Sequence, residues 1–435
     1  MGAKSGGEPA NRLFALDGIR ITAALIVVLY HYIGLNSAWG TNTSELFPVL
    51  RPFAVYGWLG VEIFFVVSGF VICMSVWGRT VGDFAVSRVS RLFPAYWAGI
   101  VLTTLVLLLL PEVGRLHDAE QWSDILINLT MMQGGLGVEH VDHSYWTLFA
   151  ELKFYALFAL VVLRGVTYRN CVLFCGIWTL AAVTAPTTDL RLLNFLSMPQ
   201  YAPYFIAGIA FYLMRRFRPT MLLWGIVGVQ FLLAQHYVRG RMETNLGLRL
   251  ADQLPTWPAR LVIAFGFLAI AAVALGLLDS VRWGWLKTAG ALTYPLYVIH
   301  MGIGITVIHA LRDRVEPVPL VVSVTAAMLA LAWLIHVFVE RPLSKRLRSG
   351  MRSGVQEIRL HTPAAVPSSP ADVAALPAPP VPEPPLPEQL APEHAVPEHL
   401  VPEPPLPEHP VPEHAEPPVR EPALPRAVGL SSLSR

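Results

Sequence analysis

The chain has 435 residues, of which 54% are hydrophobic and only 14% are charged. Soluble domains carry nearer to about 25% charged residues, so the composition excludes an ordinary soluble enzyme. The formal net charge of +2 is the sum over two segments of opposite charge. Residues 1–352 hold 28 Lys/Arg and 19 Asp/Glu, whereas residues 353–435 hold 4 Lys/Arg and 11 Asp/Glu. We therefore expect two domains, a membrane domain over 1–352 and a polar tail over 353–435.

Ten apolar stretches in the first segment are long enough for membrane helices of about 20 residues. They lie roughly at 13–34, 56–77, 93–110, 145–163, 168–185, 200–214, 219–238, 260–279, 286–309 and 318–339. The sequence thus predicts an all-α, polytopic integral membrane helical bundle with about ten transmembrane helices in the cell (cytoplasmic) membrane. The stretches at 168–185 and 200–214 give the weakest signal, because prolines crowd them.

Basic residues between the stretches indicate the orientation. With the N-terminus in the cytoplasm, the cytoplasmic segments carry 17 Lys/Arg and the outer segments carry 9. Since basic residues favour the cytoplasmic side, we expect both termini in the cytoplasm. One outer loop fits poorly, because after the seventh stretch it would hold Arg239, Arg241, Arg249 and Arg260.

The first stretch places Arg20 and His31 on one helical face, 11 residues and about 16 Å apart. A charge inside a span is expensive, which makes both residues functional candidates. Arg20 is suited to hold an anionic donor while the acyl carbon of that donor reaches His31. The alternative pairs Arg20 with Asp17 and leaves His31 as an interfacial histidine.

Glu62 lies on the second stretch among apolar neighbours, with Ser68 two turns further on. A buried carboxylate needs a partner, which we expect to be Arg20 or an arginine of the next loop, and the sequence leaves open whether Glu62 is structural or a functional acid. That loop holds Arg88 and Arg91, whose spacing suits the phosphates of a nucleotide-type donor. The alternative for this pair is a topology anchor.

The fourth stretch carries Glu151 and Tyr155 on one face, and Glu151 is a candidate to orient a base or bind a hydroxyl. Lys153 could instead neutralise Glu151, and Trp146 could be an interfacial residue. The ninth stretch ends in a stripe of three polar residues, which either line a substrate site or form hydrogen bonds between two helices. They are Tyr294, Tyr297 and His300.

Other sites receive less support. An outer loop groups four side chains of metal-binding type, but their spacing predicts no metal site; they are Glu139, His140, Asp142 and His143. No nucleic-acid-binding face is indicated. The tail repeats Pro-Glu every five residues from Pro382 to Pro412, which predicts a disordered spacer or a tail that docks a cytoplasmic partner.

Several motifs together resemble membrane acyltransferase family 3, which includes O-acetylases of O-antigen and exopolysaccharide and macrolide O-acyltransferases. The resemblance covers residues 14–345, with the motifs in the order of the family. They are Arg20 with His31, Gly60 to Phe70, Arg88 to Trp97, Trp146 to Tyr155, Thr293 to His300 and Val339 to Pro342. Thr147, where the family has serine, and Lys153 depart from the pattern.

The resemblance implies an acyl-CoA co-substrate, acetyl-CoA above all, with no bound cofactor, and a hydroxyl acceptor on a glycan or glycosylated small molecule. It implies His31 as base or acyl relay, Glu151 as its orienting group, and Arg20, Arg88 and Arg91 as donor-binding residues. No hydrolase-like C-terminal domain of the kind some members carry is recognisable. That argues against two-domain peptidoglycan or O-antigen modifiers as near relatives.

Two other classes remain as alternatives. A multi-pass transporter would suit ten spans with charges inside them, but it predicts a repeat between the two halves, which the sequence does not have. A membrane scaffold would use the Pro-Glu tail to recruit a partner. Deletion of residues 353–435 discriminates, because an enzyme would keep acyl transfer and a scaffold would lose its function.

Overall fold

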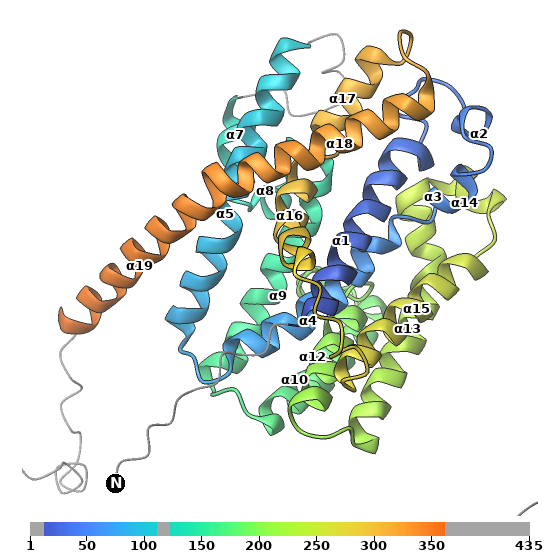
Figure 1. The fold of residues 1–435 in the computed structure, drawn as a ribbon. Coiled ribbons are helices and arrows are strands. Elements are labelled where there is room, and N and C mark those ends of the chain that lie inside the picture. The colour runs from blue at the N-terminus through green and yellow to red at the C-terminus, as the bar shows by residue number, and fades with distance from the viewer. Residues whose placement is uncertain (1–12, 111–121, 362–435) are drawn as a thin grey trace, which may run out of the picture. The chain divides into compact units, whose positions relative to one another are not determined.

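The computed structural model describes residues 13–110 and 122–361, and all regular elements in these ranges are helices (Figure 1). The long helices are α1 (Phe14–Leu29), α4 (Leu59–Val76), α5 (Val81–Leu109), α9 (Trp146–Leu163), α10 (Tyr168–Thr184), α12 (Ala202–Arg216), α13 (Met221–Leu246), α15 (Trp257–Ala274), α16 (Trp285–Ile299), α17 (Gly302–Leu311), α18 (Pro317–Ile335) and α19 (Arg341–His361). The tail expected to be disordered begins at residue 353, but residues 353–361 belong to α19, so this part of the expectation is wrong; residues 362–435 lie outside the described residues.

Short elements connect the long helices. They are α2 (Thr43–Leu46), α3 (Arg51–Ala54), α7 (Trp122–Asn128), α8 (Gln133–Leu136), α11 (Arg191–Ser197) and α14 (Leu248–Gln253), with 3-10 turns at His143–Tyr145 and Ala185–Thr187 and π-helical segments at Tyr30–Gly34 and His336–Glu340. The first π-helical segment continues α1 and carries His31. The second joins α18 to α19, so that these two helices run on without a turn.

In the described residues, eight helices are long and apolar enough to cross a membrane, and the bent pair α16–α17 would make a ninth. The chain is therefore a multi-pass membrane protein. The count is lower than about ten because α12, expected at 200–214, has only 15 residues. At 1.5 Å per residue it is about 22 Å long, shorter than the roughly 30 Å of a bilayer core.

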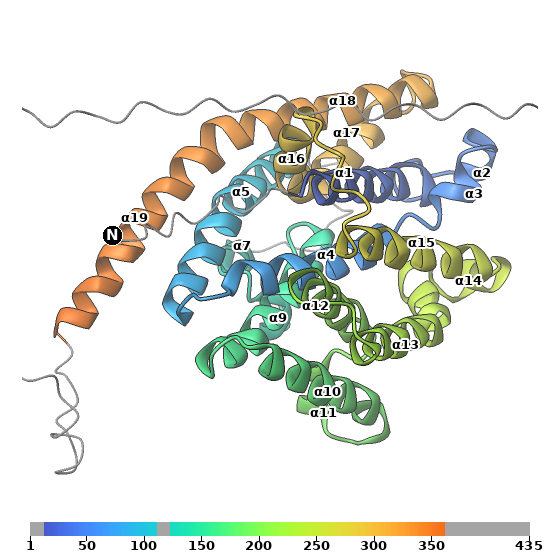
Figure 2. The same cartoon turned by 60° about the horizontal axis from the view of Figure 1, so that its bottom comes forward.

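Helix α12 is instead the enclosed centre of the bundle. Its residues from Ala202 to Met214 are all buried, and it packs against α4, α10, α13 and α15 (Figure 2). Its closest approach is to α4, where Gly208 and Gly69 face each other and an added Cβ on either would overlap the backbone of the other helix. Small residues that let backbones approach are typical of membrane helix contacts.

Three helices begin at a threonine cap. The side chains of Thr80, Thr167 and Thr220 accept hydrogen bonds from backbone N–H groups three residues later, which starts α5, α10 and α13. The cap at Thr80 corrects one expectation, because α5 begins at Val81 rather than near residue 93. Arg88 and Arg91 are therefore helical residues and not loop residues.

Helix α13 is longer than the stretch predicted at 219–238. It runs to Leu246, eight residues past the predicted end, so that Arg239 and Arg241 lie on the helix and not in the outer loop. The segment is too polar to be recognised as a helix from hydropathy. Two of the four arginines that the sequence assigned to the loop after the seventh stretch therefore belong to a helix.

Candidate active site

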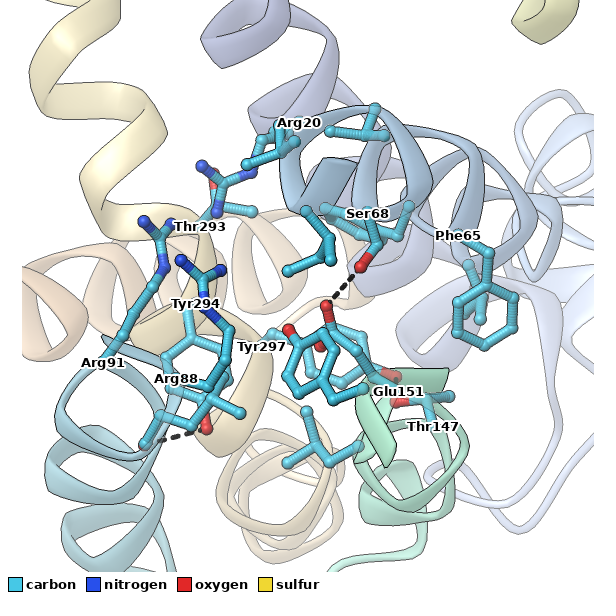
Figure 3. Close-up of a pocket in the computed structure, with 18 residues that line it drawn as sticks. Arg20, Phe65, Ser68, Arg88, Arg91, Thr147, Glu151, Thr293, Tyr294 and Tyr297 are labelled. Carbon is cyan, nitrogen blue, oxygen red and sulfur yellow. Dashed lines mark hydrogen bonds between the residues drawn. The ribbon is translucent and has the colours of Figure 1, made fainter. Parts of the chain in front are cut away.

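A pocket lies between α1, α4, α5, α9 and α16, with a volume of about 800 Å³ that includes space open to the solvent (Figure 3). It brings together residues from five separate sequence motifs. The predicted residues on its wall are Arg20, Ser68, Arg88, Arg91, Glu151, Tyr155 and Tyr297. Apolar side chains of α4, among them Phe64 and Phe65, form much of the rest of the wall.

Three arginines gather on one side of this pocket, where Figure 3 shows the guanidinium groups of Arg20, Arg88 and Arg91 close together. Arg20 also lies 3.8 Å from the carboxylate of Asp17, the local pairing that the sequence left as an alternative. Arg88 contacts the rings of Phe84 and Tyr155. Three cations in one pocket make a site for an anionic group.

Arg88 carries the clearest sign that the pocket takes a ligand. Its Nε–H is buried and has no hydrogen-bond acceptor among the described residues, while its Nη2 donates to Ser87 Oγ at 3.0 Å. A buried donor without an acceptor is costly and rare in native proteins. A phosphate oxygen of a bound donor would supply the missing acceptor.

Glu151 lies in the middle of the pocket and accepts a hydrogen bond from Ser68 Oγ at 2.6 Å (Figure 3). Ser68 comes from α4 and Glu151 from α9, so this bond joins two predicted site residues that are 83 positions apart. Lys153 does not neutralise Glu151, because its Nζ lies over the ring of Phe195 at 4.3 Å and donates to the Phe195 carbonyl oxygen.

Tyr297 of α16 also lines the pocket. Its hydroxyl lies 2.7 Å from Thr147 Oγ1, so Thr147 keeps the hydroxyl function that serine has in the family pattern. The Thr147 hydroxyl can also donate its proton to the Ser144 carbonyl oxygen, in which case the Tyr297 hydroxyl is the donor between the two side chains. Sequence reasoning treated Thr147 only as a departure, whereas the structure places it on the pocket wall.

His31 and His300 lie beyond Tyr297 and do not line this pocket. The two imidazole rings have their centroids 5.0 Å apart, and the ring of Tyr297 lies 5.4 Å from that of His300. His31 Nδ1 is 3.0 Å from the Val27 carbonyl oxygen and 3.1 Å from His300 Nε2. A carbonyl oxygen only accepts, so Nδ1 of His31 carries the proton and Nε2 of the neutral ring keeps its lone pair.

Glu62 and Trp146 belong to a different cluster. Glu62 pairs with Arg241 of α13 at 2.8 Å, and both side chains are only 1% exposed. The expected partners of Glu62, Arg20 or a loop arginine, are wrong, because α13 extends far enough to bring Arg241 to α4. The guanidinium of Arg241 also lies over the rings of Trp58, Trp146 and Tyr201. Neither Glu62 nor Arg241 lines the pocket described above.

The loop that holds Glu139 to His143 contains no metal cluster in the described part of the chain, where no group of three His, Cys, Asp or Glu side chains could hold an ion. Its residues have structural contacts instead. Asp142 accepts hydrogen bonds from Ser144 and from the Gly302 N–H, and His140 Nδ1 accepts one from Gln133 Nε2. Burial lowers the pKa of His140 to about 4, and the charge of His143 acts in the same direction.

Comparison with known proteins assigns most of the chain to one family. A family model described as an acyltransferase domain matches residues 13–337. The chain is 30% identical over 164 residues to the O-acetyltransferase OatA of Staphylococcus aureus (strain NCTC 8325 / PS 47), which is 34% of this chain and 24% of that protein. It is 26% identical over 191 residues to the peptidoglycan O-acetyltransferase OatA of Listeria monocytogenes serovar 1/2a (strain ATCC BAA-679 / EGD-e), 39% of this chain and 28% of that protein.

The chain thus spans about a quarter of the length of these two relatives. No solved structure matches the chain. A protein named as a peptidoglycan modifier is among the relatives, so the expectation that such modifiers are not near relatives is not supported.

Proposed function

The chain belongs to membrane acyltransferase family 3, and on this premise we propose that it transfers an acetyl group from acetyl-CoA to a hydroxyl of a cell-surface glycan. The observation that carries the donor half of the proposal is the buried Nε–H of Arg88, which has no acceptor among the described residues and lies in a pocket with two more arginines. The names of the relatives support the acceptor half, since both are O-acetyltransferases and one is named for peptidoglycan.

The donor enters the pocket by its anionic part. We propose that Arg20, Arg88 and Arg91 bind phosphate oxygens of CoA, because guanidinium groups form strong charge-assisted bonds with phosphate. The thioester end then points toward Tyr297 and Thr147 at the opposite end of the pocket. The apolar wall from α4 suits the uncharged pantetheine arm and a short acyl group.

His31 provides the base. Its Nδ1–H is held by the Val27 carbonyl oxygen, so the lone pair on Nε2 is available to take a proton. In the proposed reaction the acceptor oxygen attacks the thioester carbonyl carbon while its proton moves to His31 Nε2. The carbon–sulfur bond then breaks, and His31 returns the proton to the CoA thiolate. Glu151 and Tyr297 orient the reacting groups between the arginines and His31.

The same free Nε2 also suits an acyl relay, in which His31 attacks the thioester first and the acceptor hydroxyl takes the acyl group from the imidazole. Rapid quenching of purified protein with radiolabelled acetyl-CoA separates the two routes. The relay predicts a labelled, acid-precipitable protein that His31→Ala abolishes, whereas the base mechanism predicts label only in the acceptor.

The experiment that tests the function is a comparison of glycans from a deletion strain with those from the parent strain by mass spectrometry. We expect the glycan of the deletion strain to lack one O-acetyl ester, a mass difference of about 42 Da per site. The ester should return when the wild-type chain is expressed. An unchanged set of esters on glycans and glycosylated metabolites would overturn the proposal. Deleting residues 353–435 should leave the ester in place.

A further inference from the structure

His300 occupies an unusual position in the bundle. It follows α16 at the break between α16 and α17, where the helix axis bends by 67°, and its side chain is fully buried. Broken membrane helices mark binding and reaction sites in other membrane proteins, because the free backbone groups at the break must find partners. The contacts of His300 therefore indicate the role of the break between α16 and α17.

The backbone at the break is held from two distant segments. Tyr32 donates its hydroxyl proton to the His300 carbonyl oxygen at 2.7 Å, and Asp142 accepts from the Gly302 N–H at 2.7 Å. There is no space for a side chain at Gly304, because an added Cβ would overlap the Tyr32 hydroxyl. Two buried bonds and a required glycine thus fix the place of the His300 ring.

The hydrogen bonds of His300 also decide where its proton lies. Its Nδ1 is 2.7 Å from the Tyr297 carbonyl oxygen, which can only accept, so Nδ1 carries the proton. The neutral ring then has a lone pair on Nε2. This lone pair faces His31 Nδ1 at 3.1 Å, which must donate, because two lone pairs would repel each other.

The result is a directed chain of hydrogen bonds from His31 Nδ1–H to His300 Nε2 and from His300 Nδ1–H to the Tyr297 carbonyl oxygen. We propose that His300 is a positioning residue that fixes the tautomer and the orientation of the His31 ring, so that His31 Nε2 faces the reacting groups. The inference rests on the proposed function of His31 and goes beyond it by assigning the second histidine.

The physical role is that of the third member of a catalytic triad, filled here by a neutral imidazole. When His31 takes the acceptor proton, the imidazolium keeps its Nδ1–H bond to His300 Nε2, which becomes charge-assisted. The Val27 carbonyl oxygen shares that proton but belongs to the same helix as His31. His300 is the partner that comes from another helix and therefore fixes the ring against rotation.

The test compares three variants of the full chain in proteoliposomes with acetyl-CoA and the glycan that accepts the ester. His300→Leu removes the acceptor, whereas His300→Gln keeps an acceptor oxygen near the position of Nε2. We expect His300→Leu to lower kcat by about 100-fold, the low end of the contribution of acid–base catalysis, with KM for acetyl-CoA within about twofold of wild type. His300→Gln should recover at least about tenfold of that loss.

His31→Ala is the reference that keeps the two proposals apart. If His31→Ala keeps wild-type transfer, the proposed function of His31 fails. If His31→Ala is inactive while His300→Leu keeps the wild-type kcat, or if Gln and Leu at 300 are equally impaired, only the positioning role fails. Should His300→Leu not fold, Tyr32→Phe replaces it, because it releases the His300 carbonyl while the ring stays. It should lower kcat without raising KM, and an unchanged kcat would overturn the proposal.

Discussion

The ion pair between Glu62 and Arg241 gives the sharpest prediction about stability. Arg241 Nε donates to Glu62 Oε1 at 2.9 Å, Nη1 donates to Tyr201 Oη at 2.9 Å, and both charged side chains are 1% exposed. Arg241→Met leaves a buried carboxylate without its cation, which costs about 3–5 kcal/mol. At 1.4 kcal/mol per factor of ten, the unfolding equilibrium should shift about 100-fold to several thousand-fold.

Removing both charges should behave differently from removing one. The double variant Glu62→Leu with Arg241→Met replaces a buried pair by apolar side chains, and such replacements are often neutral or stabilising. Unfolding by SDS titration in mild detergent, followed by tryptophan fluorescence, measures all variants. Arg239→Met is the matched control, since Arg239 lies two residues earlier on α13 and also forms ion pairs, with Glu243 and Asp252, but its side chain is 41% exposed, and exposed ion pairs contribute only about 0–1 kcal/mol.

We expect Arg239→Met to lower the unfolding midpoint slightly at most, Arg241→Met to lower it strongly, and the double variant to recover most of the loss. The reasoning would be refuted if Arg241→Met unfolded like Arg239→Met. It would also be refuted if the double variant were no more stable than the single variants, because the cost would then come from packing and not from an unpaired charge.

Three further predictions concern the pocket, the contact between α4 and α12, and the loop that holds His140. Arg88→Ala should raise KM for acetyl-CoA about tenfold or more, since a hydrogen bond to a charged group is worth about 1.5–3 kcal/mol, and initial rates measure it. Gly208→Ala should destabilise the fold by about 1–3 kcal/mol through overpacking against α4, whereas Gly228→Ala on α13, where a Cβ meets nothing within 4 Å, should not. Stability should fall as the pH drops from about 6.5 toward 4, because His140 binds a proton in the unfolded chain but not in the folded chain, where its pKa is lowered to about 4. In thermal unfolding, the melting temperature of His140→Gln should fall less over this pH range than that of wild type.

Each of these has a clear contrary result. An unchanged KM in Arg88→Ala would remove Arg88 from the donor site. Equal melting temperatures for the two glycine variants would mean that α4 and α12 do not meet as closely as described. An identical pH dependence with and without His140 would place the acid sensitivity elsewhere in the chain.

Much of the pocket could be predicted from the sequence because membrane charges are costly and therefore few. Arg20, Glu151 and Tyr297 stood out as polar residues on predicted membrane helices, and Arg88 as one of an arginine pair in a predicted loop; the structure places all four on one pocket wall. Helical periodicity indicated which residues share a face of one helix, whereas their grouping in one pocket depends on the packing of several helices. Their roles in catalysis stay predictions.

The remaining features depend on contacts between distant segments. The polar end of α13 has the composition of a loop, and only the tertiary contact between the side chains identifies Arg241 as the partner of Glu62, 179 residues away. The break after α16 lies in an apolar run, Val298 to Ile305, that hydropathy takes for one helix. The contact between His31 and His300 joins residues 269 positions apart, so no local pattern could indicate it.

The most direct test of the account is acetyl transfer by the purified chain in proteoliposomes. Wild type and His31→Ala are supplied with radiolabelled acetyl-CoA and the cell-surface glycan identified by mass spectrometry, after equal melting temperatures have shown that both are folded. The account predicts ester-linked label in the glycan with wild type and at least a 100-fold lower rate with His31→Ala, in line with the contribution of acid–base catalysis (about 10²–10⁴-fold). Equal rates for the two proteins would contradict it.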